Sequence, residues 1–532
     1  MESTMIFCPR PLFRVIVPKL PSETIFSMGA KTATSLSAVM IATVANKALS
    51  WLDVVVIDEN NYRRSLRAPL DANGNPDHAA LQRDRPATFI GLSCTMTNAM
   101  PRVLDLVCFY RQDSRVKGIF AGGRHVHNEP VEILEAGADV VVHGEGEGII
   151  VELLTAFASG LEISRIPGIS YKKEGSVVRN EPKYLKNLDL DTLPHPDFSL
   201  VGYSKIKRFP VSRTRGCSGN CEFCSVNDSP RWISPERFLD QFRYLISIGV
   251  RKFFIVDDRV EEDMEGARRF FSLLAEDVRK KKLRLDIMVQ ARLSCADDDE
   301  FLKLMNMAGV TNVCIGYESP IVDELKAMQK PINPKKMLEW TRKFKRAGFF
   351  IHAMMIFGYP LKTQRSEEKQ ISARELADLF WKFLKQAIRA GVDTLKILLP
   401  SPITGTPLWS RLKKEGRLYD VDRKYHDGTR LLFQPDPGID PKELQLEYIR
   451  LMRKFYVRSI LWPMKSVSLV VHIVRIGFIT ISLPVEYFIS GFGPWYNKWR
   501  NSLIYFGAHL IIWKWHNNFK KSKFIAKLRR TK

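Results

Sequence analysis

Short apolar runs alternate with helical stretches along the first 160 or so residues. The candidate strands are residues 54–57 (VVVI), 88–93 (TFIGLS), 118–121 (GIFA) and 139–142 (DVVV). Nearly continuous apolar runs of this length are typical of parallel strands that helices cover on both faces. The pattern therefore predicts an α/β fold that begins with a doubly wound, Rossmann-like sheet.

Each of the later predicted strands is followed by a small or polar loop. These loops read SCTMT (93–97), GGRHVH (122–127) and HGEGEG (143–148). In doubly wound sheets the loops at the carboxyl ends of the strands form the ligand crevice. Glycine in such loops lets the backbone approach a ligand closely. A ligand site is therefore expected at this edge of the sheet.

A second alternating pattern begins near residue 209, after a proline-punctuated segment with an apparent hairpin (GISYKKEGSVVRNEP). Its candidate strands are 252–256, 283–289, 312–316, 350–357 and 394–399, with helical periodicity at 235–248 and 298–308. With the strand that enters the cysteine-rich loop, six strands predict a partial (β/α)6 barrel of the TIM type. The expected domains are residues 1–165, a linker and hairpin at 166–205, the barrel at 206–430, and a helical, basic, aromatic-rich region at 431–532.

Cysteine content and charge restrict the function classes. Eight cysteines in 532 residues are too few for a disulfide scaffold, and no export signal is evident at the amino terminus, so a reducing cytoplasm is expected. Of the net charge of +23, about +14 falls on residues 453–532, which hold fifteen Lys and Arg against one acid, Glu486. A nucleic-acid-binding protein would be expected to spread this charge over its main domains. No nucleic acid partner is therefore expected.

Three cysteines in the segment TRGCSGNCEFCSVN carry the strongest chemical signal. Cys217, Cys221 and Cys224 have the spacing C-x3-C-x2-C. Three thiolates this close can bind three irons of a [4Fe–4S] cluster and leave the fourth iron open to chelation by an amino acid. A structural zinc site usually has four ligands, and the closest further candidate, His195, lies beyond a proline-rich stretch. The spacing favours the cluster, with zinc or a purely structural role as the alternative.

The cysteine spacing, with Phe223 just before the last cysteine, resembles the radical S-adenosylmethionine (SAM) superfamily. The resemblance implies reductive cleavage of SAM to a 5′-deoxyadenosyl radical, fed by an electron donor such as flavodoxin or ferredoxin. It also implies that polar residues at the barrel's strand ends hold SAM, and ordinary rim salt bridges are the alternative for each. The SAM contacts expected are Phe223, Asp257, Gln290, Arg292, Glu318 and Ser319. The later segments FGYP (357–360) and LPSPITGTPL (399–408) also resemble this group and are expected to form turns.

The amino-terminal domain resembles the cobalamin-binding domain of class B radical SAM enzymes, and together the two resemblances cover about residues 54–436. The resemblance implies cobalamin contacts at Ser93, Thr95, Gly122, Gly123, His125, Gly144, Glu145 and Gly146. The DxHxxG motif that supplies a histidine to cobalt in many cobalamin proteins is absent, because the segment after Ile57 reads DENNYR. We therefore expect base-off binding without a histidine ligand. The alternative is a domain that has lost cobalamin.

The carboxyl-terminal tail leaves three interpretations open. Residues 467–490 are long enough for a membrane span, but Arg475 lies inside this segment, and a central arginine costs roughly 2.5–3.5 kcal/mol on insertion scales. Five of the ten tryptophans, Trp462, Trp495, Trp499, Trp513 and Trp515, mix with basic residues here, which is typical of segments at the level of lipid headgroups. Peripheral association with the inner face of the cell membrane is the interpretation favoured over a helical cap on the barrel or a true span.

The combined features predict a cobalamin-dependent radical SAM methyltransferase. Its expected reaction methylates an unactivated carbon of an apolar, lipid-like or polycyclic small molecule, through a 5′-deoxyadenosyl radical and methylcobalamin. One alternative is a non-methylating radical SAM enzyme, such as an oxidative cyclase or a rearrangement enzyme. Another alternative is a membrane-attached iron–sulfur redox sensor.

Overall fold

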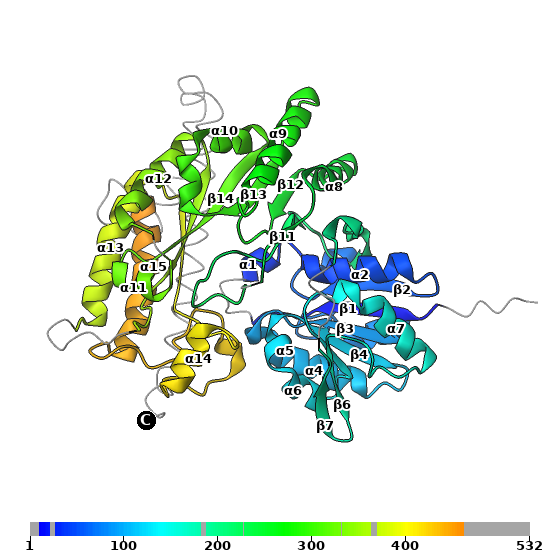
Figure 1. Cartoon of the computed structure of the whole chain (residues 1–532). Helices are drawn as coiled ribbons and strands as arrows, with labels where there is room; N and C mark the ends of the chain where they lie inside the picture. The colour runs from blue at the N-terminus through cyan, green and yellow to red at the C-terminus, as the bar shows by residue number, and fades with distance from the viewer. Residues whose placement is uncertain are drawn as a thin grey trace, which may run out of the picture.

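The computed structural model describes residues 10–21, 27–181, 188–226, 228–330, 332–362 and 370–461. Two sheets, each with its own helices, dominate these residues (Figure 1). The first has eight strands in the order β7-β6-β5-β4-β3-β1-β2-β8, and the second has six in the order β16-β15-β14-β13-β12-β9. The predicted α/β fold, a doubly wound domain followed by a barrel-type domain, is confirmed.

The first sheet is parallel except at one edge. Its parallel strands are β1 (Leu12–Val17), β2 (Asp53–Asp58), β3 (Phe89–Ser93), β4 (Gly118–Gly122), β5 (Val140–Val142) and β8 (Val201–Gly202). Helices α2 (Leu36–Ala48) and α7 (Ile150–Ser159) pack on one face, and α4 (Met100–Arg111) and α6 (Pro130–Glu135) pack on the other. Burial of both faces explains the apolar runs from which the strands were predicted.

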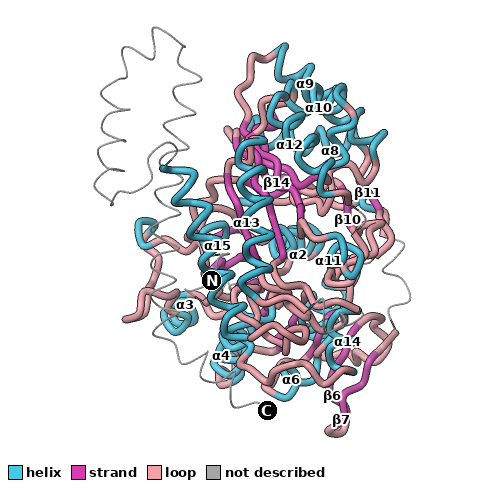
Figure 2. Tube along the Cα trace, turned by 90° about the vertical axis from the view of Figure 1, so that its left-hand side faces the viewer, coloured by secondary structure: helices cyan, strands magenta, loops and turns pink. Residues whose placement is uncertain are grey.

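The hairpin expected in the linker belongs to this sheet. Strands β6 (Ile169–Lys173) and β7 (Ser176–Arg179) extend it antiparallel to β5, and Figure 2 shows them at the far end of the molecule from the barrel helices. Strand β8 pairs with β2 at the opposite edge. The predicted linker at 166–205 therefore supplies three strands to the first sheet.

Strand β1 is not among the strands predicted from the sequence, and it lies between β2 and β3 in the sheet. The strand reads LFRVIV, and the buried Arg14 interrupts its apolar pattern. The Arg14 guanidinium donates to Gln82 Oε1 at 2.8 Å and to the Tyr110 hydroxyl at 3.1 Å. A buried charge is stable only with such hydrogen bonds, and these bonds explain how a charged residue can occupy a strand in the middle of this sheet.

The second sheet is an open, all-parallel barrel wall. Its strands are β9 (Phe209–Val211), β12 (Lys252–Ile255), β13 (Asp286–Ala291), β14 (Val310–Glu318), β15 (Phe350–Ile356) and β16 (Thr394–Leu398). The helices that follow them are α8 (Pro235–Ser247), α9 (Met264–Lys280), α10 (Asp299–Met307), α12 (Pro334–Arg346) and α13 (Ala373–Ala390). Their buried faces share one core with the strands. The six strands confirm the predicted partial barrel.

Two local features set the limits of this domain. Helix α15 (Pro441–Leu461) closes the free edge of β16, because the Tyr456 hydroxyl accepts from Leu395 N at 3.1 Å. At the amino ends of the strands, Arg208 donates to the Phe253 and Asp286 carbonyls at 3.0 Å and to the Asp286 carboxylate at 2.7 Å. These polar groups at the amino ends are paired with each other. In barrels of this type ligands bind at the carboxyl ends of the strands, so the site is expected there.

The tail beyond residue 461 lies outside the described residues. The predictions that concern it, namely the basic tryptophan-rich segment, the membrane association and the possible span at 467–490, all fall there. Within the described part of the chain, none of the helices combines the length and the apolar character needed to cross a membrane.

Candidate active site

The cysteine loop leaves the barrel after β9 through a narrow neck. Strand β10 (Thr214–Arg215) pairs antiparallel with β11 (Arg231–Trp232), and Cys217 N donates to Asp228 O at 3.1 Å. Gly216 has φ 85°, and a Cβ added there would lie 2.6 Å from Asp228 O. Only glycine fits this position, and the neck therefore fixes the position of Cys217, the first cysteine of the loop.

The three cysteine thiols of the loop are half-buried and lie near one another, since burial and then the neighbouring Cys221 and Cys217 raise the pKa of the Cys224 thiol. Two of them border Gly219, where a Cβ would lie 3.3 Å from Cys217 Sγ and 4.0 Å from Cys221 Sγ. Backbone N–H groups donate to sulfur, from Gly219 to Cys217 at 3.4 Å and from Val226 to Cys224 at 3.3 Å. Such bonds stabilise thiolate sulfur and are one of the factors that tune iron–sulfur clusters. Three adjacent thiols with N–H donors and a glycine that leaves space fit a [4Fe–4S] cluster.

The zinc alternative finds no support in His195, the candidate fourth ligand. His195 Nε2 lies 2.7 Å from the Arg237 guanidinium, on the outside of the barrel at α8. Burial and Arg237 together lower the pKa of His195. The imidazole is therefore engaged elsewhere.

Glu222, inside the loop, anchors it to the barrel. Its buried carboxylate accepts from Arg411 at 2.9 and 3.0 Å and from the Tyr359 hydroxyl at 2.6 Å. Its carbonyl accepts from Leu408 N at 3.0 Å. Phe223 lies edge-on to the Tyr359 ring, with 6.2 Å between centroids, on the apolar core rather than on the thiols. The FGYP and LPSPITGTPL segments thus form the turns that hold the cysteine loop.

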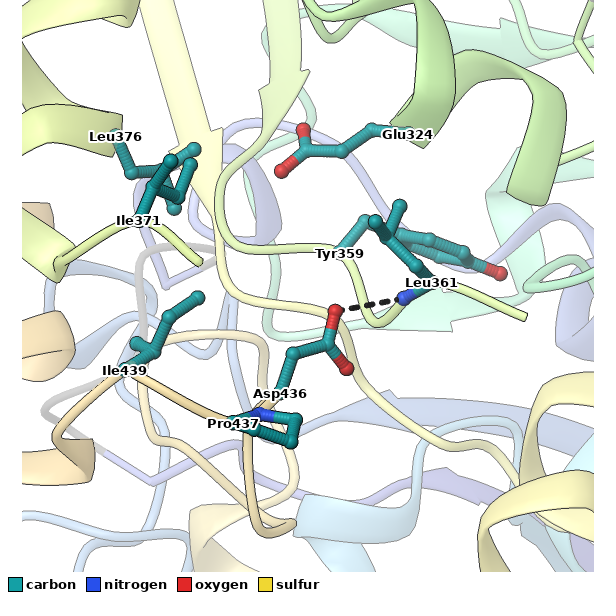
Figure 3. A pocket seen from close by; sticks show the side chains of 8 residues that line it. All are labelled: Glu324, Tyr359, Leu361, Ile371, Leu376, Asp436, Pro437 and Ile439. Carbon is teal, nitrogen blue, oxygen red and sulfur yellow. Dashed lines mark hydrogen bonds between the residues drawn. The ribbon is translucent and has the colours of Figure 1, made fainter. Parts of the chain in front are cut away.

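A small pocket lies behind Tyr359, and Figure 3 shows the side chains that line it. Its lining residues are Glu324, Tyr359, Leu361, Ile371, Leu376, Asp436, Pro437 and Ile439. Asp436 accepts from Leu361 N at 3.0 Å and so fixes the turn after FGYP. None of the predicted SAM or cobalamin contacts lines this pocket, which belongs to the support of the loop.

Two of the predicted SAM contacts converge on the cysteines. The Arg292 guanidinium reaches the cysteine loop, because a Cβ at Gly219 would lie 2.9 Å from its Nη2. Glu318 ends β14 with φ 57° and forms an ion pair with Lys330. Burial raises the pKa of the Cys221 thiol, Lys330 opposes that shift and Glu318 adds to it, so both charges act on the same sulfur. A cationic and an anionic side chain beside the thiols match the carboxylate and ammonium of an amino acid.

The other predicted SAM contacts are hydrogen-bonded within the protein. Asp257 accepts from the Ser212 hydroxyl and from Arg213 N, both at 2.8 Å. Burial raises its pKa to about 6, and Oδ2 has no hydrogen-bond partner among the described groups. Gln290 donates to the Asp257 carbonyl at 3.0 Å. The buried Ser319 hydroxyl bonds to Glu324 and to Ile321 N.

Two charged residues after β12, which the sequence pattern does not single out, also contact the cysteine loop. Glu262 accepts from Ser218 N at 3.0 Å, and Arg259 donates to the Ser218 hydroxyl at 3.0 Å. Their neighbour Glu261 accepts from Arg292 N at 3.2 Å and so contacts the residue that reaches the loop from β13. The signal was present in the charged segment DDRVEED, which follows the strand beyond Asp257.

Glycine-rich loops meet at the carboxyl ends of β3, β4 and β5 in the first sheet. Gly123 has φ 127°, and a Cβ there would lie 2.6 Å from the Cys94 carbonyl carbon. Gly144 has φ 77°, and a Cβ at Gly146 would lie 2.8 Å from Ile41 Cδ1. The predicted cobalamin contacts Ser93, Thr95 and Gly122 lie on these same strand ends and loops. Side chains at Gly123 and Gly146 would collide with neighbouring protein atoms, so these glycines let the loops pack closely at the strand ends, which is where doubly wound sheets bind their ligands.

His125 is buried between the two domains. Its Nδ1 lies 3.1 Å from the Thr97 hydroxyl, and its Nε2 has no partner among the described groups. Its ligand atoms, with those of Glu129 and Glu132, lie within 4.8 Å of one another. Arg423 of the barrel domain pairs with Glu129 at 2.7 Å and with Glu132 at 2.9 Å. The Arg423 guanidinium thus supplies the positive charge that balances these two carboxylates. Burial and Arg423 together lower the pKa of His125 to about 4.

The loops after β4 and β5 also contact the cysteine loop directly. Glu145 forms ion pairs with Arg215, at 3.2 Å, and with Arg231, and Glu147 pairs with Arg215 at 2.7 Å. Arg124 donates to Ser225 O at 2.6 Å. The fold therefore brings the predicted cobalamin loops and the predicted cluster loop into contact.

Known families and relatives agree with this geometry. Family models match as the radical SAM superfamily at residues 211–368, the B12-binding domain at 32–154, and a domain of unknown function, DUF4070, at 406–461. An uncharacterized methyltransferase of Pyrococcus horikoshii is 28% identical over 390 residues, which cover 70% of this chain and 79% of that protein. The hopanoid C-2 methylase of Rhodopseudomonas palustris is 28% identical over 243 residues, 44% of each chain. The radical SAM methyltransferase TsrM of Kitasatospora setae shares the fold, with a TM-score of 0.62, 15% identity, and coverage of 84% of this chain and 89% of its own.

Proposed function

Because this chain joins a B12-binding domain to a radical SAM domain, it is a cobalamin-dependent radical SAM enzyme, and we propose that it methylates carbon in a small-molecule substrate. The observation that carries the proposal is the contact between the glycine loops of the first sheet and the cysteine loop of the barrel. Methyl transfer to carbon requires the methyl source and the radical source to face one substrate, and the contact between the loops supports such an arrangement.

The residues have distinct proposed roles. When bound, the cluster and SAM supply a radical that abstracts hydrogen from carbon, and cobalamin supplies the methyl group. Cys217, Cys221 and Cys224 hold three irons, which leaves the fourth for SAM. Arg292 orients the carboxylate of SAM, and Glu318 orients its ammonium or ribose hydroxyls. Asp257, Gln290 and Ser319 maintain the shape of the strand ends through the hydrogen bonds described above.

The amino-terminal site is proposed to hold cobalamin through backbone atoms. Gly122, Gly123, Gly144 and Gly146 present peptide groups rather than side chains, and Ser93 and Thr95 add polar atoms beside them. The absence of the DxHxxG motif, where the segment after Ile57 reads DENNYR, supports binding of cobalt without a histidine ligand. An external one-electron donor completes the system.

An apolar substrate is the proposed class. The support is the hopanoid methylase among the relatives and the basic, tryptophan-rich tail of the sequence, which favours contact with lipid. The proposed substrate is a lipid or polycyclic compound with an unactivated carbon.

The experiment measures two products in one anaerobic incubation. The protein is reconstituted with iron, sulfide and cobalamin, then given dithionite, SAM with a deuterated methyl group, and a panel of polycyclic lipids. We expect 5′-deoxyadenosine together with S-adenosylhomocysteine, and a mass increase of 17 in one lipid. S-adenosylhomocysteine must disappear when cobalamin is omitted.

The other outcomes point to the alternatives. 5′-Deoxyadenosine without S-adenosylhomocysteine, in a reaction that consumes a substrate, would replace methyl transfer with a non-methylating reaction such as oxidative cyclisation. A reconstituted cluster that yields neither product would indicate a redox sensor.

A further inference from the structure

Four side chains join the two domains at the neck of the cysteine loop. Glu145 and Glu147 come from the loop after β5, and Arg215 and Arg231 come from the paired strands β10 and β11. We call these four residues the interdomain clamp. Arg215 contacts both carboxylates, so the clamp is one connected network rather than two separate ion pairs.

The clamp holds a part of the fold that is weak by itself. Strands β10 and β11 have two residues each, and an isolated two-stranded ribbon is at best marginally stable in water. Arg215 lies two residues before Cys217, so a shift of the neck moves the first cysteine. The barrel fixes the loop at Glu222, five residues after Cys217, through Arg411 and Tyr359. The clamp is therefore the matching support at the base of the loop.

The clamp is shielded enough to matter energetically. The side chains of Glu145 and Glu147 are 19% and 8% exposed, and those of Arg215 and Arg231 are 27% and 29% exposed. Salt screens partly buried pairs much less than surface pairs. Removing one partner of such a network leaves the other charge uncompensated, which costs more than losing a surface ion pair.

A second contact from the same domain supports the far side of the loop. Arg124, next to Gly123, donates to Ser225 O at 2.6 Å and pairs with Asp228 at 3.1 Å. Ser225 follows Cys224, and Asp228 O accepts from Cys217 N. The loops after β4 and β5 thus contact both ends of the cysteine loop.

We propose that Glu145 and Glu147 are positioning residues for the iron–sulfur site, acting through Arg215 and Arg231. This inference rests on the proposed cofactor sites. Glycines and glutamates alternate in the segment HGEGEG, so the loop predicted to border cobalamin is also the loop that holds the cysteines. Binding of cobalamin is then expected to raise the affinity for SAM, and by linkage SAM raises the affinity for cobalamin by the same factor.

The test compares Glu145→Gln/Glu147→Gln with the wild-type holoenzyme. Iron content, cobalamin content and the EPR spectrum of the reduced cluster are measured while SAM is titrated. We expect unchanged iron content, an apparent Kd for SAM raised about tenfold, and an altered SAM-dependent EPR signal. Omitting cobalamin should weaken SAM binding in the wild type and have little further effect in the variant.

The matched control is Glu129→Gln/Glu132→Gln. This double change breaks both ion pairs that Arg423 of the barrel domain forms with the first domain. The control should leave the SAM titration unchanged. If it shifts SAM affinity as much as the clamp variant, general domain docking explains the effect and the proposal is wrong.

A double-mutant cycle separates the clamp from direct cobalamin contact. Glu145→Gln and Arg231→Gln should each shift the SAM titration, and the combined variant should shift it no further than the larger single change. If Glu145→Gln instead lowers cobalamin content while Arg231→Gln changes nothing, Glu145 is a cobalamin contact and the proposal fails. These readouts need no methyl transfer, so the proposed function can fail while the clamp stands.

Discussion

The candidate sites at the carboxyl ends of the two sheets are formed by different groups, one by backbone and the other by charged side chains. At the strand ends of the first sheet, the proposed cobalamin site consists mainly of backbone, because a side chain at Gly123 or Gly146 would collide with neighbouring atoms and Gly123 and Gly144 have positive φ. At the barrel the strand ends carry charges, among them Arg292, Glu318 and Asp257. A large planar ring system needs a surface that follows its shape, whereas a small zwitterion and a metal cluster need defined charges and ligand atoms.

The difference determines how each site responds to mutation. A backbone site fails when a side chain is added, since the new atoms occupy the space of the ligand or of the neighbouring loop. A side-chain site fails when a group is removed. The following predictions test this comparison from the largest expected effect to the smallest.

Cys221→Ala should abolish SAM cleavage, which is the largest expected effect. Loss of one of three thiolates leaves an incomplete ligand set for the cluster. Chromatography of an anaerobic reaction with dithionite should show 5′-deoxyadenosine reduced at least about a hundredfold, with iron content lowered in parallel. The control Cys108→Ala removes an exposed thiol on α4 and should retain both. Undiminished 5′-deoxyadenosine from the Cys221 variant would refute the assignment of the cluster.

Much of this site was accessible from sequence because its signals are local. Cys217, Cys221 and Cys224 lie within eight residues, and the apolar runs of β2, β3 and β4 are continuous. The partners of the charged residues were not accessible. Glu222 meets Arg411 and Glu132 meets Arg423, pairs separated by 189 and 291 positions. Only the tertiary fold brings these charges together.

Two charged residues show what the local sequence pattern does not reveal. Arg14 interrupts the apolar pattern of β1, and the polar atoms that accommodate it come from Gln82 and Tyr110, which follow much later in the chain. The resemblance to the cobalamin-binding domain predicts that Glu145 contacts cobalamin, and nothing in the sequence links it to the barrel. Its carboxylate pairs with Arg215 and Arg231, so its loop contacts the barrel as well as bordering the first sheet's strand ends.

Adding a methyl group at Gly123 should disrupt the first sheet's site through the protein itself. In Gly123→Ala the Cβ meets the Cys94 backbone at 2.6 Å, at a φ of 127° that L-residues rarely adopt. Strain and overpacking together should cost roughly 2–6 kcal/mol. Thermal unfolding should show a clearly lower Tm, and reconstituted protein should hold little cobalamin.

Gly122→Ala sharpens this comparison, because its Cβ would have 3.8 Å to the nearest atom, Val142 Cβ. This variant should keep the wild-type Tm and lose cobalamin affinity only if the backbone there faces the ligand. A large fall in the Tm of the Gly122 variant would contradict the geometric argument, and wild-type cobalamin binding would remove Gly122 from the contacts.

The smallest expected effect concerns the charge buried at the barrel's strand ends. Burial raises the folded pKa of Asp257 from 3.8 to about 6. A raised folded pKa contributes stability that is fully present below 3.8 and is lost as the pH rises through about 6. An amide does not titrate, so Asp257→Asn should gain stability relative to the wild type as pH rises from about 4 to about 7. The gain should be at most about 3 kcal/mol, from about 1.4 kcal/mol per unit.

The difference in Tm between Asp257→Asn and the wild type, measured across this pH range, checks the expectation. In the variant the Ser212 hydroxyl and Arg213 N can donate to the amide oxygen, so these two hydrogen bonds are kept in a side chain that does not titrate. Asp286→Asn is the matched control, because hydrogen bonds and Arg208 hold the pKa of Asp286 below its usual value despite burial. Its Tm difference should change in the opposite direction, because the Tm of Asp286→Asn should fall relative to that of the wild type as the pH rises through the ordinary carboxyl range. A Tm difference for Asp257→Asn that does not change with pH would show that the carboxylate is solvated, and the barrel's strand ends would then be more open than its paired charges indicate.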